Sequence, residues 1–126
     1  MKAEIAAGEL IDKITILAIK RQRIADPARL RNVEHEYAQL SALHQAELPA
    51  DDKLAELEAA LLAVNEIIWQ VEDDIRDCER RQDFGPAFIA LARAVYINND
   101  QRAAIKREIN ERLHSAIVEE KSYTAY

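Results

Sequence analysis

The strongest constraint on the fold is a ladder of apolar residues through the middle of the chain. Its members recur at alternating steps of three and four residues: Leu54, Leu57, Leu61, Val64, Ile68, Val71, Ile75 and Cys78. An average period of about 3.5 residues is typical of a helix whose apolar seam packs on other helices, as in a coiled coil. The ladder therefore predicts an all-α fold with one long central helix, about residues 52–81.

Helix start signals divide the rest of the chain. Asp is a favoured N-cap and Pro a favoured first helical residue, so Asp26-Pro27 predicts a helix that ends near Glu47. A first helix precedes it, from residue 4 or 9 to about residue 25, and another follows Pro86. Asn and Asp favour caps over helix interiors, so we expect a break or kink at residues 98–100. The result is a helical bundle of four to five helices.

Length and composition favour a single helical domain over residues 1–126. No apolar run approaches the ~20 residues of a membrane span, and the first residues lack the apolar stretch of a secretory signal. The one cysteine excludes an internal disulfide, and its place on the ladder predicts a packing role. We therefore expect a cytoplasmic protein that does not enter a membrane.

Acidic side chains concentrate on the long helix. Residues 51–80 carry 10 acidic and 3 basic side chains, a net charge of −7. Residues 1–50 have a net charge of 0, and residues 81–126 a net charge of +1. Proteins that bind nucleic acid usually carry a clear basic excess. The absence of one here argues against a nucleic-acid partner.

The acid cluster of the long helix invites a metal hypothesis. Asp73 and Asp77 lie one helical turn apart, as do Asp74 and Asp77. All-helical nucleotide pyrophosphohydrolases hold Mg²⁺ or Mn²⁺ between such motifs on two adjacent helices. The matching Glu-x-x-Glu on a partner helix is missing, because Glu34 and Glu36 are two residues apart and point to different faces. We expect a solvated acidic face, with no metal and no cofactor.

A second, polar face runs beside the ladder. Asn65, Trp69, Glu72 and Arg76 follow at steps of four, three and four residues, so they line up on the helix. A lone Trp beside an Arg/Glu pair suits the wall of a binding site. The alternative is a Trp at the edge of the core whose indole N–H finds a polar partner.

The densest polar pattern lies near the C-terminus. Four residues share a helix face at steps of three, four and four: Asn99, Arg102, Lys106 and Asn110. Arg93 and Tyr96 join them if the helix is nearly continuous. Arg, Lys and Asn together suit an anion such as a phosphate or carboxylate. The alternative is that the cations pair with acids of the long helix, for instance Glu72 or Asp73.

The first helix adds polar residues that can approach this face. Asp12 and Thr15 lie one turn apart and are placed to face the same cleft, and Lys13 follows Asp12. No Gly-rich phosphate loop and no recognisable Ser nucleophile occur in the chain.

Four segments together resemble a family of small helical bacterial proteins of unknown function (DUF6165). They are GELIDKITIL (8–17), VNEIIWQVEDDIR (64–76), LARAVYINNDQRAAIKREIN (91–110) and IVEEKSY (117–123). The resemblance implies no activity. It implies that the polar residues within these segments form a shared site: Asp12, Lys13, Trp69, Glu72, Arg93, Tyr96, Asn99, Arg102, Lys106 and Glu120. It also suggests a link to cell-surface polysaccharide metabolism.

These observations favour a non-enzymatic helical binding or adaptor module with an anion-compatible surface. The long helix exceeds the expected length of its partners, so a homodimer is expected to cover its seam. The alternative is a small enzyme or binder of an anionic metabolite, such as a phosphorylated sugar, nucleotide or carboxylate. Chorismate-mutase-like enzymes illustrate that class, but the first helix lacks the early Arg they use, and the longest helix here is the third.

Overall fold

The computed structural model describes residues 1–114 and 122–126, which contain four α-helices and no strand. The helices are α1 (Ala7–Arg23), α2 (Pro27–Glu47), α3 (Asp52–Arg80) and α4 (Pro86–Arg112). The all-α fold with a long central helix is thereby confirmed. In the described part of the chain, no helix combines the length and hydropathy needed to cross a membrane.

Aspartate side chains cap the starts of α2 and α3. The Asp26 carboxylate accepts a hydrogen bond from the backbone N–H of Arg29 at 3.0 Å, and Pro27 is the first residue of α2. The Asp51 carboxylate accepts from the backbone N–H of Lys53 at 3.3 Å and caps α3. Each carboxylate satisfies an N–H group that has no partner inside its helix.

The break expected at residues 98–100 is wrong, because α4 runs through them without interruption. The Asn98 side chain donates to the carbonyl of Ala94 at 2.8 Å, and the Asn99 side chain donates to the carbonyl of Val95 at 3.0 Å. Both amides therefore bond to carbonyls one turn back and leave the helix intact. Packing along α3 outweighs their weak helix propensity.

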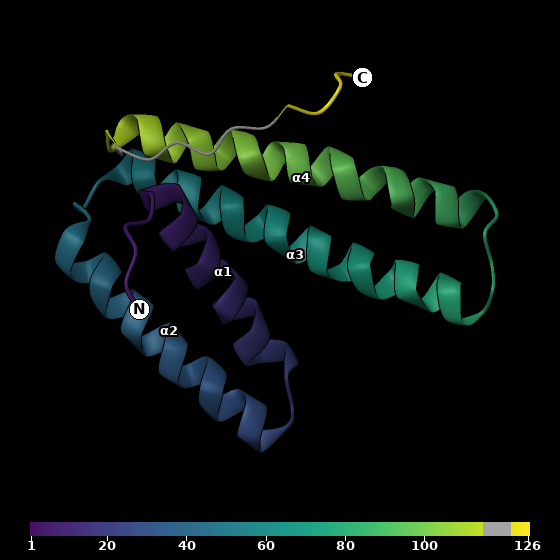
Figure 1. The fold of residues 1–126 in the computed structure, drawn as a ribbon, viewed down its shortest axis with the longest axis horizontal. Coiled ribbons are helices and arrows are strands. Elements are labelled where there is room, and N and C mark those ends of the chain that lie inside the picture. The colour runs from purple at the N-terminus through teal and green to yellow at the C-terminus, as the bar shows by residue number, and fades with distance from the viewer. Residues whose placement is uncertain (115–121) are drawn as a thin grey trace.

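The four helices form two hairpins that meet at one end (Figure 1). α3 and α4 lie side by side and antiparallel, and α1 and α2 form the second hairpin. α1 packs on both α3 and α4, whereas α2 packs on α1. The core lies where α1 crosses, and it consists of Ile11, Leu54, Leu57, Leu61 and Ile109.

Because α1 diverges from α3, the α3/α4 hairpin has two unlike halves (Figure 1). We call residues 52–65 and 100–112 the proximal half, which α1 crosses, and residues 66–99 the distal half. The proximal ladder residues are all buried. In the distal half Val71 and Cys78 are buried against α4, but Ile68 and Ile75 are only half-buried.

Candidate functional site

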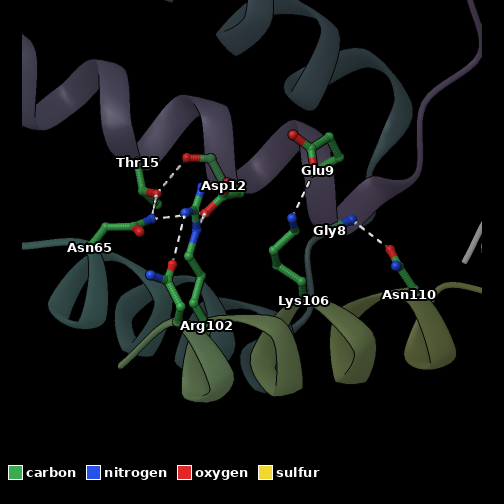
Figure 2. Close-up of polar contacts among 9 residues, drawn as sticks. Gly8, Glu9, Asp12, Thr15, Asn65, Arg102, Lys106 and Asn110 are labelled. Carbon is green, nitrogen blue, oxygen red and sulfur yellow. Dashed lines mark hydrogen bonds and ion pairs between the residues drawn. The ribbon is translucent and has the colours of Figure 1, made fainter. Parts of the chain in front are cut away.

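The most distinctive feature of the interior is a polar cluster between α1 and the proximal half. It joins residues of three helices (Figure 2): Gly8, Glu9, Asp12 and Thr15 of α1, Asn65 of α3, and Arg102, Lys106 and Asn110 of α4. Polar groups at such a helix crossing must find partners, because each unpaired one costs about 1–3 kcal/mol.

Asp12 is the centre of this cluster and is 1% exposed. Arg102 donates two hydrogen bonds to the Asp12 carboxylate, from Nε to Oδ1 at 2.9 Å and from Nη2 to Oδ2 at 2.5 Å. The Asn65 amide donates to Asp12 Oδ1 at 2.9 Å and to the Thr15 hydroxyl at 2.8 Å. The Thr15 hydroxyl donates to the carbonyl of Asp12 at 2.7 Å. Both carboxylate oxygens therefore have partners.

The charge state of Asp12 follows from two opposing effects. Burial is the largest single effect and raises the pKa of this carboxyl group, whereas hydrogen bonds from Arg102 and Asn65 lower it. The positive charges of Arg102 and Lys106 add to the hydrogen bonds, and the pKa of Asp12 lies below its ordinary value. A carboxyl group that stays ionised at neutral pH cannot donate a proton as a general acid there.

The second part of the cluster fixes the start of α1 on α4. The Lys106 ammonium lies 2.8 Å from a carboxylate oxygen of Glu9, and Lys106 is 7% exposed. The Asn110 side-chain carbonyl accepts from the backbone N–H of Gly8 at 2.7 Å (Figure 2). A Cβ on Gly8 would lie 2.5 Å from the backbone oxygen of Lys106, so only glycine permits this approach. Within residues 1–114 and 122–126, every buried side-chain nitrogen and oxygen has a partner.

A groove opens beside the polar cluster, where α1 diverges from α3. We call it the α1–α3 groove, and its volume is about 330 Å³. Its lining comprises Ile16, Ile19, Asn65, Ile68, Trp69, Glu72, Asp73, Arg76 and Arg102. An apolar wall with a few convergent polar groups is the usual character of a binding pocket, and the volume lies at the lower end of the common range.

The predicted site residues fall into three groups. Asp12, Arg102, Lys106 and Asn110 meet in the polar cluster. Trp69 and Glu72 line the α1–α3 groove, where Arg102 joins them. The acids that face Arg102 and Lys106 belong to α1, not to the acidic α3 that the sequence suggested as their partner.

The remaining candidates lie elsewhere. Lys13 points to α2, where its ammonium is 3.4 Å from a carboxylate oxygen of Glu36. Arg93 is exposed on α4 and makes no ion pair within the described part of the chain. Tyr96 lines a cavity of about 620 Å³ beside the C-terminal residues 123–126. Asn99 also lines this cavity, but its side-chain oxygen accepts a hydrogen bond from Arg102 Nη1 at 3.4 Å, which connects it to the polar cluster. Glu120 lies outside the described residues.

The acidic residues of α3 form no metal-binding arrangement. In residues 1–114 and 122–126, no group of three or more His, Cys, Asp or Glu side chains is placed to share an ion. Asp77 instead pairs with Arg80 and Arg81 on its own helix turn. Asp77 has a lowered pKa, chiefly through the hydrogen bond from Arg80.

Sequence reasoning missed Gly8, Glu9, Ile16 and Ile19 as parts of these sites. The signal for Gly8 is present, because a glycine in the first turn of a helix predicts a close backbone approach. Glu9 offers an i,i+4 partner in Lys13, which hides its bond to Lys106. The two isoleucines had no signal beyond membership of a wide apolar helix face.

Comparison with known protein families supports the resemblance of the four segments. A family model described as a family of unknown function (DUF6165) matches residues 1–126. Searches of curated proteins and of solved structures found no match.

Proposed function

The chain belongs to the DUF6165 family of unknown function, and from the geometry we propose that it is a non-enzymatic helical binding module. Its binding surface is the α1–α3 groove, which adjoins the distal half. The observation that carries the proposal is the contrast between an apolar, partly open groove and the fully partnered polar cluster behind it.

The groove lining favours binding over catalysis. Among the described residues that line it there is no Ser, Cys or His to act as a nucleophile or as a base near neutral pH. Asp12 stays ionised, and both its oxygens are occupied by Arg102 and Asn65. What the groove offers a partner is apolar contact, from Ile16, Ile68 and the Trp69 indole.

Arg102 and Lys106, which the sequence suggests as anion-binding residues, form ion pairs within the chain. Arg102 forms a bidentate pair with Asp12, and Lys106 pairs with Glu9. The groove rim carries Glu72 and Asp73 against Arg76, so it has no positive excess. This balance favours an apolar protein surface over a phosphate or carboxylate as the ligand.

An uncharged dye tests the groove. Nile red emits more strongly in apolar surroundings, and at submicromolar protein concentration we expect it to bind the folded chain saturably. Ile68→Glu places a charge in the groove and should abolish this binding. Ile67→Glu is the matched control, because Ile67 is an exposed isoleucine on the same helix and outside the groove lining. Dye binding that both variants leave unchanged would contradict the proposal.

A second arm tests the anionic alternative. Thermal melts with inorganic phosphate, nucleotides, phosphorylated sugars and aromatic acids are compared with sodium chloride at equal ionic strength. We expect no stabilisation beyond that of the salt. Saturable stabilisation by one of these anions, lost in Arg76→Ala, would replace the proposal with an anion-binding function. Arg76 is the suitable position because its side chain is exposed at the groove rim.

A further inference from the structure

The surface of the chain is larger than a compact monomer of its mass requires. The accessible surface is 8634 Å² for 14.3 kDa. A compact monomer of this mass exposes about 6,800 Å². The excess is larger than the ~800 Å² per partner that a standard interface buries.

Within the four helices, most of the large exposed apolar side chains lie in the distal half. Ile67, Phe84, Ile89 and Tyr96 are exposed there, and Ile68 and Ile75 of the ladder are half-buried. Two helices alone form a single layer, which cannot bury the seam between them from both sides. In the proximal half α1 supplies the second layer. α1 diverges from the hairpin before the distal half, so the distal half is a single layer and the surface forms a step where the two halves meet (Figure 1).

Two copies of such a stepped surface can fit together when one is rotated by 180° relative to the other. A two-fold axis perpendicular to α3 would place the distal half of a second copy in the space beside α1, and the reverse. We propose, as a deepening of the proposed function on which it rests, that the occupant of this surface is a second copy of this chain. The hairpin tip of each copy fills the α1–α3 groove of the other.

Charges on α3 specify the register. Glu72 and Arg76 share a face four residues apart, and both line the groove. An antiparallel pairing of two α3 helices about an axis near Asp74 places Glu72 of each copy opposite Arg76 of the other. The intrahelical pair is thereby exchanged for two symmetric interchain pairs, which fix orientation more than they add affinity.

The same register brings the hairpin tip of one copy, residues 81–85 between α3 and α4, to the α1–α3 groove of the other. With the axis near Asp74, the last residue of α3, Arg80, lies opposite Ile68 of the second copy. The tip beyond Arg80 carries Phe84, which is exposed and stacks edge-to-face on Phe88 at 5.3 Å between ring centroids. An exposed aromatic pair at this point fits the apolar wall formed by Ile16 and Ile68.

Charge exchange tests the register directly by sedimentation equilibrium. The parent chain should sediment as twice 14.3 kDa at micromolar concentration. Glu72→Arg and Arg76→Glu should each dimerise more than about tenfold more weakly, because like charges then face each other. Mixed in equal amounts, the two variants should form a heterodimer, because each supplies the charges the other lacks. The double variant on one chain should regain the parent mass.

Phe84→Ala tests the tip. Phe84 is exposed, so thermal melting at concentrations where the chain is monomeric should be little changed, while dimerisation weakens. Leu43→Ala is the matched control, as an exposed apolar residue of α2 that lies outside both the distal half and the groove lining. A monomer at every concentration, or a dimer that Glu72→Arg and Phe84→Ala both leave intact, would overturn the second-copy proposal.

Nile red binding distinguishes a failure of the second-copy proposal from a failure of the proposed binding function of the groove. If the second copy covers the groove, the Nile red bound per chain should fall as protein concentration rises through the dimerisation range. Dye binding that depends on Ile68 but not on protein concentration leaves the binding module standing and removes the second copy. A dimer whose groove never binds the dye, even when diluted to monomer, removes the groove as the binding site.

Discussion

The proximal and distal halves of the α3/α4 hairpin carry one apolar ladder but bury it to different extents. Leu61 in the proximal half is 0% exposed, whereas Ile68, two turns further along α3, is half-buried. The spacing of the ladder is the same in both halves. The difference is α1, which crosses the proximal half and then diverges. Periodicity therefore determines which face of a helix points inward, but a crossing helix determines whether that face is covered.

The ion pairs of the two halves differ in the same way. In the proximal half the pair of Arg102 with Asp12 joins two helices and its acid is buried, whereas Lys53–Glu56 and Arg107–Glu111 are exposed pairs within one helix. Distal pairs, such as Arg76 with Glu72, lie within one helix and are exposed. Pairs of the second kind contribute only a few tenths of a kcal/mol. The Arg102–Asp12 pair therefore holds the tertiary structure, while the exposed pair of Arg76 with Glu72 is available to a partner.

The largest effect is expected where a proximal charge is removed. Arg102→Ala leaves the buried Asp12 carboxylate without its bidentate partner, and the free energy of unfolding should fall by about 3–5 kcal/mol. Urea denaturation followed by circular dichroism measures this loss. Arg93→Ala is the matched control on the same helix, and it should change stability by under about 0.5 kcal/mol because Arg93 is exposed. If Arg102→Ala cost no more than the control, Arg102 would belong to a ligand site and not to the scaffold.

The ladder itself provides the next comparison. Leu61→Ala should cost about 2–5 kcal/mol, the range for large-to-small changes in a core. Ile68→Ala, measured at concentrations where the chain is monomeric, should cost about 1 kcal/mol or less, because its side chain is already half in water. Urea denaturation of both variants beside the parent chain measures the two losses in free energy of unfolding. Equal costs would mean that the distal half is as well covered as the proximal half.

Much of this fold is readable from the sequence, for local reasons. Asp26-Pro27 and Gly85-Pro86 act through capping and backbone geometry within a few residues, so they placed α2 and the start of α4 correctly. The uninterrupted course of α4 through Asn98 was not readable, because packing against α3 overrides the local preference of that residue.

The site was readable only in part. Helical spacing correctly aligned Arg102, Lys106 and Asn110 on one face, and it aligned Trp69 with Glu72. For the partners of these cations the sequence left two possibilities open, the cleft shared with Asp12 of the first helix and the acids of α3, and the structure pairs Arg102 with Asp12 and Lys106 with Glu9, both of α1. Crossing angles between helices depend on side-chain packing over the whole interface, which no spacing rule encodes.

Gly8, which contacts the proximal half, and Gly85, at the distal tip, allow the same comparison of the two halves with smaller expected effects. A Cβ on Gly8 would lie 2.5 Å from the backbone oxygen of Lys106, so Gly8→Ala must push α1 away from α4. We expect a cost of about 1–3 kcal/mol, despite the better helix propensity of alanine. Gly85→Ala at the distal tip meets only the Asp83 carboxylate at 3.3 Å, and it should cost under about 1 kcal/mol. Thermal melts of the two variants measure the difference, and a Gly8→Ala protein as stable as the parent would show that α1 is not held closely on α4.

The smallest effect expected is the dependence of stability on acid pH. The pKa of Asp12 is lowered in the folded chain, so its contribution is fully present above the ordinary aspartate pKa of about 3.9 and is lost as the pH falls through the lower folded value. The free energy of unfolding should therefore fall on acidification, and its slope against pH should be shallower in Asp12→Asn. Asp77→Asn is the distal control. Although Asp77 also has a lowered pKa through Arg80, it is exposed, and solvent screens its pairing. Urea denaturation over a series of acidic pH values gives the three slopes. A slope that Asp77→Asn reduces more than Asp12→Asn would reverse the assignment of structural charge to the proximal half.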